Sequence, residues 1–310
     1  MANTVQNIFN NLVARVTNAQ GPLIGPCTAL QVAYTDISTS PTSAKSIVIP
    51  LPRLGPATVQ PNGVPVTRSF NIDEVTMTFG EPVGVSGVFF DVDQAYTDQQ
   101  ISSLFTGPAV GRVMEGINAV VLNQLTPANF AVNPVITTGG GQVQPTDITN
   151  ARKALSKQLV PVTDQANMNL LLGADVYNNM LPNTVYTAEQ ITGINAAEAG
   201  RAGGYLRRLY GANVLEEPAL PTTGSGNTAS YTSYYGHRWA IALAVRVPSL
   251  GPNDGQTCFS AITFARPGVP VRVSLQYQLS AGGWVFSVQA MAASTVVRPE
   301  MGQILLTTAA

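Results

Sequence analysis

The sequence has 310 residues, of which only 33 carry a charge, 16 of them basic and 17 acidic. That share is 11%, where soluble domains average roughly 25%. Hydrophobic residues make up 45%, which excludes a disordered chain, and the net charge of −1 argues against a protein that holds nucleic acid on a basic surface. Because so few charges protect a surface poorly against association, we expect the chain to work in an assembly or in an apolar environment.

The membrane is the weaker of these two alternatives. The longest uninterrupted apolar run, residues 239–245, is far shorter than the roughly 18 residues that a membrane-spanning helix needs. The first residues contain no basic leader and no long apolar block, so we expect no signal peptide. Cys27 and Cys258 are too few for a disulfide scaffold and are expected to be buried thiols. Of the two alternatives, work within an assembly therefore remains as the expectation.

Residues 1–19 have the periodicity of an amphipathic helix with one apolar stripe. The stripe consists of Val5, Ile8, Phe9, Leu12, Val13 and Val16. Arg15 is the one charged residue before Asp36. Such a helix has to cover its stripe, either on its own chain or on a neighbour.

Residues 36–80 predict an extended arm of two strands. Five prolines between positions 50 and 65 exclude a helix and favour edge strands, and Asn62-Gly63 is a hairpin turn signal. The alternation of apolar residues changes phase at Asp73-Glu74, which predicts a β-bulge. A two-stranded ribbon is too thin to be stable alone, so it must pack on another part of the molecule or on another subunit.

The rest of the chain predicts an α+β fold with a clear C-terminal hairpin. We expect strands at 83–92, 169–172, 205–215, 240–245, 271–279, 284–288 and 303–307, and helices at 97–125, 146–158 and 174–181, with a weakly helical segment at 196–201. Gly107-Pro108 is expected to divide the long helix. Strand 240–245 has one face of alanines that suits close packing by a helix.

No pattern in the sequence indicates catalysis or metal binding. His237 is the sole histidine, and it is best explained as a hydrogen-bonding residue at a strand edge. The segment around Ser86 lacks the spacing of a nucleophile elbow, and Gly139 to Gly141 are not followed by the residues of a phosphate loop. Asp91-Val92-Asp93 fits a helix cap better than a divalent-ion site. We therefore expect no enzyme, no cofactor and no metal.

One pair of carboxylates and two arginines stand out as contact charges. Glu216 and Glu217 are adjacent, so in an extended chain they face opposite ways and cannot act as a paired acid and base. Arg207 and Arg208 lie close by in sequence.

A remote alternative is a β-rich hydrolase that uses His237 with Ser86 or Cys258.

Four segments resemble a known family. Met77-Thr78-Phe79-Gly80-Glu81-Pro82, followed by Phe89-Phe90 and a long helix, resembles the start of the peripheral domain in podovirus coat proteins of the P22 type. Asn169-Leu170-Leu171-Leu172 with Ala174-Asp175-Val176-Tyr177 resembles the family's central strand and helix. Gly211 to Leu215 with Pro218-Ala219-Leu220-Pro221, and the hairpin 271–288 with Val296 to Glu300, resemble its later strands. Together with the order of elements, they resemble the major capsid protein of tailed bacteriophages, with the HK97-like fold but without the domain inserted in the P22-type coat.

The resemblance implies a division of the chain. The expected parts of the chain are an N-terminal arm at 1–35, an extended loop at 36–80, a peripheral domain with a long spine helix at 81–139, an axial domain at 140–268, and a closing peripheral-domain hairpin with the final strand at 269–310. It also implies a virion protein, made in the bacterial host cytoplasm, that self-assembles as hexamers and pentamers into an icosahedral head around double-stranded DNA. Binding to DNA would not be sequence-specific, and no membrane would be involved.

The implied partners are further copies of the chain, a separate scaffolding protein, a portal and, as an option, a cement protein. An encapsulin-like shell, or a tube, sheath or decoration protein, is the alternative in the same structural class. We expect both arms to bury their apolar residues on neighbours, so that deleting residues 1–19 would leave a folded subunit that cannot assemble. The residues expected at subunit contacts are Val5, Ile8, Phe9, Leu12, Arg15, Arg53, Arg68, Glu81, Arg207, Arg208, Glu216 and Glu217.

Overall fold

The computed structural model describes residues 5–18, 28–42, 45–53, 71–90, 98–131, 133–137, 142–181, 208–223, 230–249, 258–265, 268–278, 280 and 282–308. Its helices are α1 (Val5–Asn18), α2 (Ala29–Val32), α3 (Asp98–Leu122), α4 (Pro145–Lys157) and α5 (Ala174–Met180), with 3-10 helices η3 (Pro127–Asn129), η5 (Arg238–Ala240) and η7 (Pro299–Met301). Its strands are β1 (Tyr34–Thr42), β2 (Ser46–Arg53), β3 (Asn71–Thr78), β4 (Val83–Phe90), β5 (Val135–Ile136), β6 (Met168–Leu172), β7 (Arg208–Leu209), β8 (Ala212–Glu216), β9 (Thr222–Thr223), β10 (Ser230–His237), β11 (Ile241–Pro248), β12 (Cys258–Ala265), β13 (Val269–Gln278), β14 (Gly283–Val296) and β15 (Gly302–Thr308).

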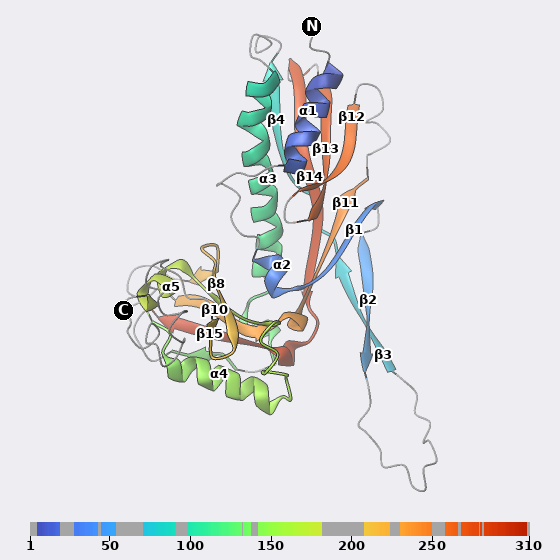
Figure 1. Ribbon diagram of the computed structural model, residues 1–310. Helices are drawn as coiled ribbons and strands as arrows, with labels where there is room; N and C mark the ends of the chain where they lie inside the picture. The colour runs from blue at the N-terminus through green and yellow to red at the C-terminus, as the bar shows by residue number, and fades with distance from the viewer. Residues whose placement is uncertain are drawn as a thin grey trace.

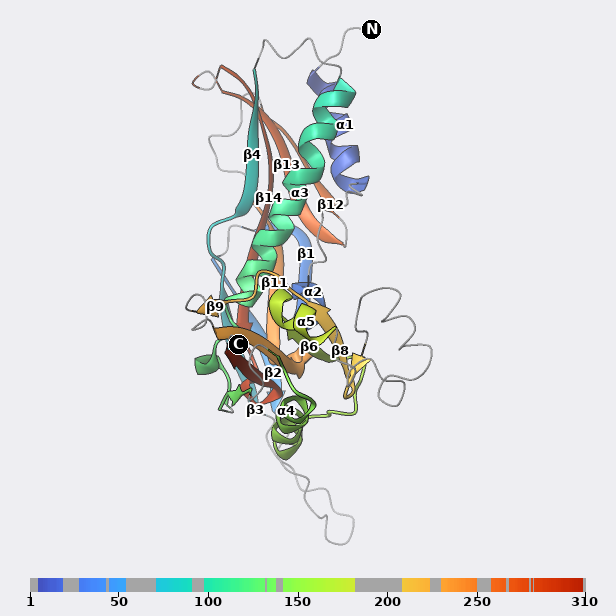
Figure 2. The same cartoon turned by 90° about the vertical axis from the view of Figure 1, so that its left-hand side faces the viewer.

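The body of the molecule is a six-stranded sheet with helices on one face. The strand order is β1-β11-β14-β13-β12, and β4 pairs with the first half of β14. Helices α1 and α3 lie side by side along the sheet (Figures 1 and 2). The apolar positions that alternate along β13 and β14, such as Val273 and Phe286, point toward these helices and form the main core with Val113 and Ile117 of α3. The predicted C-terminal hairpin is confirmed, because β13 and β14 pair antiparallel.

The N-terminal helix is also confirmed, but its apolar stripe is covered by its own subunit. Leu12 and Val16 are fully buried in the main core. The Phe9 ring lies 5.8 Å from the ring of Phe259 on β12. The expectation that this helix buries its stripe on a neighbouring subunit is therefore wrong. Periodicity shows which face of a helix must be covered, but not that α3 and β12 leave an apolar strip open beside them.

Helix α3 runs without a break from Asp98 to Leu122, so the predicted division at Gly107-Pro108 is wrong. Pro108 lies on the exposed side of the helix, while Thr106, Ala109 and Val110 next to it are buried. A proline removes one backbone hydrogen bond, but the packing of the buried side holds the helix together on both sides of it.

A second lobe is built on a seven-stranded sheet. The strand order is β5-β15-β10-β6-β8-β7, with β9 added beside β10. Helices α4 and α5 cover one face and form a second core with Leu170, Leu305 and Tyr235. The other face continues into the main core through Leu171, Ile304 and Tyr234. The predicted strands at 169–172 and 303–307 and the helices near 146–158 and 174–181 are all present, within a few residues at their ends.

The chain crosses between the two sheets at η5 and at η7 (Figure 1). Strand β10 lies in the seven-stranded sheet and β11 in the six-stranded sheet, although only three residues separate them. The expected axial segment 140–268 includes β11 and β12, which lie in the six-stranded sheet. The final strand of the segment 269–310, which the resemblance allows to return to the axial domain, lies in the seven-stranded sheet as β15. Apolar alternation identifies a strand and its faces, but it carries no information about which sheet the strand joins.

The two-stranded arm is present and projects away from the body (Figure 1). Strands β2 and β3 pair in one continuous antiparallel register, with Asp73 opposite Leu51 and Glu74 opposite Pro50, so the predicted β-bulge is wrong.

The root of the arm packs on the alanine face of β11. Met77 and Phe79 are buried against Ala242, Ala244 and Ala293, which form a third core. The expected helix is therefore replaced on this face by the arm. The predicted turn at Asn62-Gly63, the segment Asp91-Val92-Asp93, the glycines 139–141, the weak helix at 196–201 and Cys27 lie outside the described residues.

Candidate functional site

A buried polar junction ties the two lobes together. The Glu217 side chain follows β8 and is only 5% exposed. Its Oε2 accepts hydrogen bonds from Thr28 Oγ1 and Asn118 Nδ2, both at 2.5 Å, and its Oε1 accepts one from Ala219 N at 3.0 Å. The Asn118 Oδ1 accepts a further bond from Ala29 N at 2.9 Å. The carboxylate thus joins the start of α2, the C-terminal part of α3 and the loop after β8.

This placement corrects one expected contact. Glu217 is an internal support and not a contact charge, while Glu216 beside it is exposed at the end of β8. The prediction that the two side chains face opposite ways is confirmed. Asn118 was not singled out from the sequence, although it is the polar residue in the otherwise apolar stripe of α3, which includes Met114, Ile117 and Val121.

Two arginines hold the chain that leads into the arm. Arg238 Nε donates to Ala33 O at 2.9 Å, and its Nη2 lies 3.3 Å from both Leu30 O and Thr35 Oγ1. Arg246 of β11 donates from Nη1 to Asp36 O at 2.9 Å and pairs through Nη2 with Asp36 Oδ2 at 2.7 Å. A planar guanidinium with several donors suits this role, because it fixes successive groups of one backbone at once. The first residues of β1 are therefore held firmly against the body.

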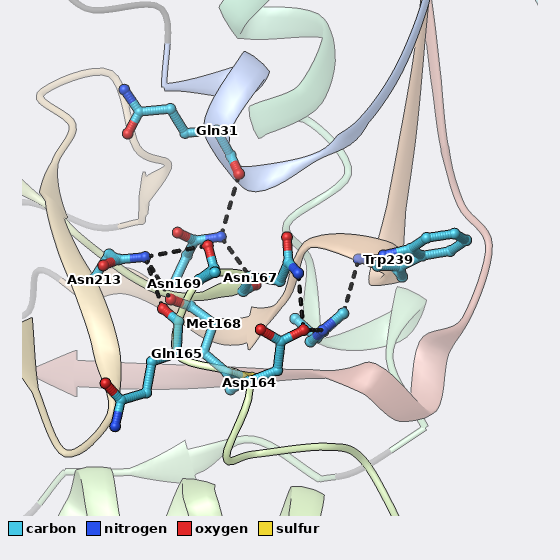
Figure 3. A network of polar contacts seen from close by, with 10 residues as sticks. Gln31, Asp164, Gln165, Asn167, Met168, Asn169, Asn213 and Trp239 are labelled. Carbon is cyan, nitrogen blue, oxygen red and sulfur yellow. Dashed lines mark hydrogen bonds and ion pairs between the residues drawn. The ribbon is translucent and has the colours of Figure 1, made fainter.

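A network of polar contacts that includes Asp164 and Trp239 supports the turn between the sheets (Figure 3), and His237 joins these two residues. Its Nδ1 accepts a hydrogen bond from Trp239 N at 3.2 Å, which leaves Nε2 as the donor toward Asp164 Oδ2 at 3.4 Å. The pKa of Asp164 is lowered first by the hydrogen bond from Asn167 and then by His237. His237 is thus a buried hydrogen-bonding residue, as predicted.

The hydrolase alternative finds no support in this geometry. His237 ends β10 in the seven-stranded sheet, whereas Ser86 on β4 and Cys258 on β12 lie in the six-stranded sheet. Ser86 pairs with Ser287 in an unbroken stretch of strand. Among the described residues, no group of three or more His, Cys, Asp or Glu side chains could hold a metal ion. None of the described helices is long and apolar enough to cross a membrane.

The remaining expected contact residues are spread over the molecule. Ile8 is half-buried against the main core, and Arg15 is half-exposed on α1. Glu81 and Arg208 are exposed, and Arg208 Nε donates to Asn213 Oδ1 at 3.0 Å. Arg53 is the last residue of β2 in the arm, and Val5 is the first residue of α1; the structure describes their backbone but not their side chains. Arg68 and Arg207 lie outside the described residues. The structure does not gather these residues into one site.

No protein-family model and no curated protein matches the sequence. The fold, in contrast, matches solved structures of phage capsids over nearly the whole chain. The capsid of cyanophage P-SCSP1u is 14% identical with a TM-score of 0.56, and the match covers 90% of this chain and 88% of that one. For the capsid of Ralstonia phage GP4, the identity is 11%, the TM-score 0.56 and the coverage 90% and 87%.

The asymmetric unit of the mature capsid of bacteriophage PhiM1 gives a similar result. It is 10% identical, with a TM-score of 0.55 and coverage of 90% and 86%. The body with its long helix, the second lobe and the projecting arm therefore have one known architecture. The chain has the HK97-like fold of tailed-phage capsid proteins.

Proposed function

We propose that this chain is the major capsid protein of a tailed bacteriophage and that its copies form an icosahedral shell around double-stranded DNA. The observation that carries the proposal is the match of the whole fold, with about 90% of both chains covered in capsid structures of several phages. The role is structural and not enzymatic. The shell is built from hexamers and pentamers of this one chain, located in the virion.

The shape of the subunit supports assembly. The chain exposes 16428 Å² of surface, whereas a compact monomer of 32.5 kDa exposes roughly 12,400 Å². The arm contributes to this excess, since beyond its root the two strands have no third strand or helix beside them in the described part of the chain. A thin ribbon of this kind is marginal in water and gains stability when a neighbour covers it.

The division into domains follows the sheets. We assign the peripheral domain to the six-stranded sheet with α1 and α3, and the axial domain to the seven-stranded sheet with α4 and α5. The extended loop is the arm of β2 and β3. Arg53, Glu81, Arg208 and Glu216 stay in the proposal as contact residues. A separate scaffolding protein, a portal and an optional cement protein complete the assembly, and DNA is enclosed without sequence-specific contacts.

Expression of the chain in a bacterium, followed by sedimentation and electron microscopy of the purified material, tests the proposal. Closed shells of uniform or near-uniform size support it. Tubes or sheaths would replace it with another virion role, and shells that carry protein cargo but never DNA would favour an encapsulin. A chain that stays monomeric at all concentrations, also in the presence of crowding agents, would contradict it.

A further inference from the structure

An exposed aromatic pair lies where the arm, the body and the second lobe meet. The Tyr34 ring at the start of β1 and the Trp239 ring of η5 are stacked, with their centroids 5.1 Å apart and their planes at 27°. The guanidinium carbon of Arg298 lies over the Trp239 ring, 6.0 Å from its centroid. We call these three residues the aromatic cluster.

The aromatic cluster does not belong to the subunit's own cores. Tyr34 is 40% and Trp239 is 44% exposed, and neither ring is part of any of the three hydrophobic cores of the described residues. Together they leave roughly 200 Å² of aromatic surface in water. The other tryptophan, Trp284, is packed against the main core. The stacked pair therefore offers aromatic surface of the kind that is enriched at protein interfaces.

The backbone beneath the Trp239 and Arg298 side chains is held rigidly. Val297 N and Arg298 N both donate to Ala240 O, at 2.8 and 3.1 Å. Trp239 N is fixed by His237. The end of η5 and the segment between β14 and η7 are therefore held together at the base of the two side chains.

The residues on both sides of Tyr34 are held by one guanidinium, Ala33 through its backbone carbonyl and Thr35 through its side-chain hydroxyl. Arg238, the residue before Trp239, bonds Ala33 O and Thr35 Oγ1. The cluster is therefore preorganised, and binding to it loses little further conformational entropy.

We propose that Tyr34, Trp239 and Arg298 are the anchor of a contact between two copies of this chain. Tryptophan, tyrosine and arginine are the residue types that dominate the energy of protein interfaces. Arg298 forms no ion pair with a carboxylate in the described part of the chain, so its charge is free to meet an acidic side chain of the second copy. The sequence contains 17 acidic residues, which can supply the carboxylate on the second copy. The low number of charged residues gives a surface that does not oppose self-association.

This inference rests on the proposed function, because a shell repeats the same contact at every subunit. Because the contact is repeated throughout the shell, each single contact can be small, and removing its anchor residues weakens the contact at every subunit. The position of the cluster suits such a role, since β1 leads from it directly into the arm and η5 and η7 lead from it into both sheets.

The test compares Trp239→Ala, Tyr34→Ala and Arg298→Glu with the wild-type chain. Tyr34→Phe is the matched control, because it keeps the stacked ring. We expect the subunit concentration needed for self-association, measured by sedimentation velocity, to rise roughly tenfold or more in the first three variants and to stay unchanged in the control. The melting temperature of the dissociated subunit should stay within about 2 °C of wild type in all four, because none of the three side chains belongs to a hydrophobic core of the described residues.

Self-association of Trp239→Ala and Tyr34→Ala at the wild-type concentration would overturn the inference. A large fall in melting temperature would do the same, since the cluster would then serve the fold. If the wild type self-associates without closing into shells, the proposed function fails, but the comparison of variants still decides on the cluster. A wild type that remains monomeric at every concentration would overturn both.

Discussion

Leu12 provides the sharpest test of how the N-terminal helix is used. Its side chain is fully buried in the main core, between α1 and the body of the same subunit. Leu12→Ala removes apolar groups whose transfer is worth about 2.4 kcal/mol, and the cavity left behind raises the loss to about 3 kcal/mol or more. The unfolding entropy of a 310-residue chain is roughly 0.65 kcal/mol/K, so we expect the melting temperature to fall by about 5 °C.

The measurement has to be made on dissociated subunits by calorimetry or urea unfolding. Asn11→Ala on the same helix is the matched control, because Asn11 is exposed and its replacement should change stability by less than about 0.5 kcal/mol. If Leu12→Ala left the subunit as stable as the control but prevented assembly, the stripe of α1 would have to bind a neighbour, and the packing described here would be refuted.

Three further predictions concern the interior. Glu217→Ala should lower the free energy of unfolding by about 3 kcal/mol, since it leaves Asn118 Nδ2 without its acceptor and Thr28 Oγ1 with Asn118 Oδ1 alone, whereas Glu216→Ala should change it by less than about 0.5 kcal/mol; equal effects in urea unfolding would contradict the buried junction. Gly302→Ala should lower stability by about 1 to 3 kcal/mol, because a Cβ there would lie 2.3 Å from Phe130 Cε1 and 2.9 Å from Tyr234 Cε2, and an unchanged melting curve would show that the rings can move. Burial raises the pKa of Tyr234 well above its usual value of 10.0, so the unfolded chain loses this proton first and stability should fall above about pH 10. Tyr234→Phe should flatten that alkaline fall by about 1.4 kcal/mol per pH unit and be neutral or slightly stabilising at pH 7, where its hydroxyl has no partner in the described structure; an unchanged slope would count against this assignment.

The elements whose faces are unequally buried could be predicted from the sequence. Val273 and Leu275 are buried and alternate with the half-buried Ser274 and Gln276, because the body sheet carries helices on one face only. The stripe of Phe9, Leu12 and Val16 has helical spacing for the same reason. In both cases the pattern records which face is covered. The pattern does not record which element covers that face. For this reason the sequence predicts that α1 packs on a neighbouring subunit and that a helix packs on the alanines of β11, whereas the structure shows neither.

The candidate contacts were harder to predict, because they depend on residues distant in sequence. Tyr34, Trp239 and Arg298 come from three separate parts of the chain and meet only through the two crossings between the sheets. Nothing in the sequence around Trp239 distinguishes it from a core residue. Glu217 was misjudged for a related reason, since a carboxylate is normally exposed and its three buried donors come from α2, α3 and its own loop.

A three-dimensional reconstruction of the assembled particle by electron cryomicroscopy tests the central claim most directly. The account predicts a closed icosahedral shell in which copies of this fold surround both fivefold and sixfold positions, with the arm and the aromatic cluster of each copy covered by other copies. A helical tube, an open sheet, or a shell in which Trp239 faces solvent in every copy would contradict it.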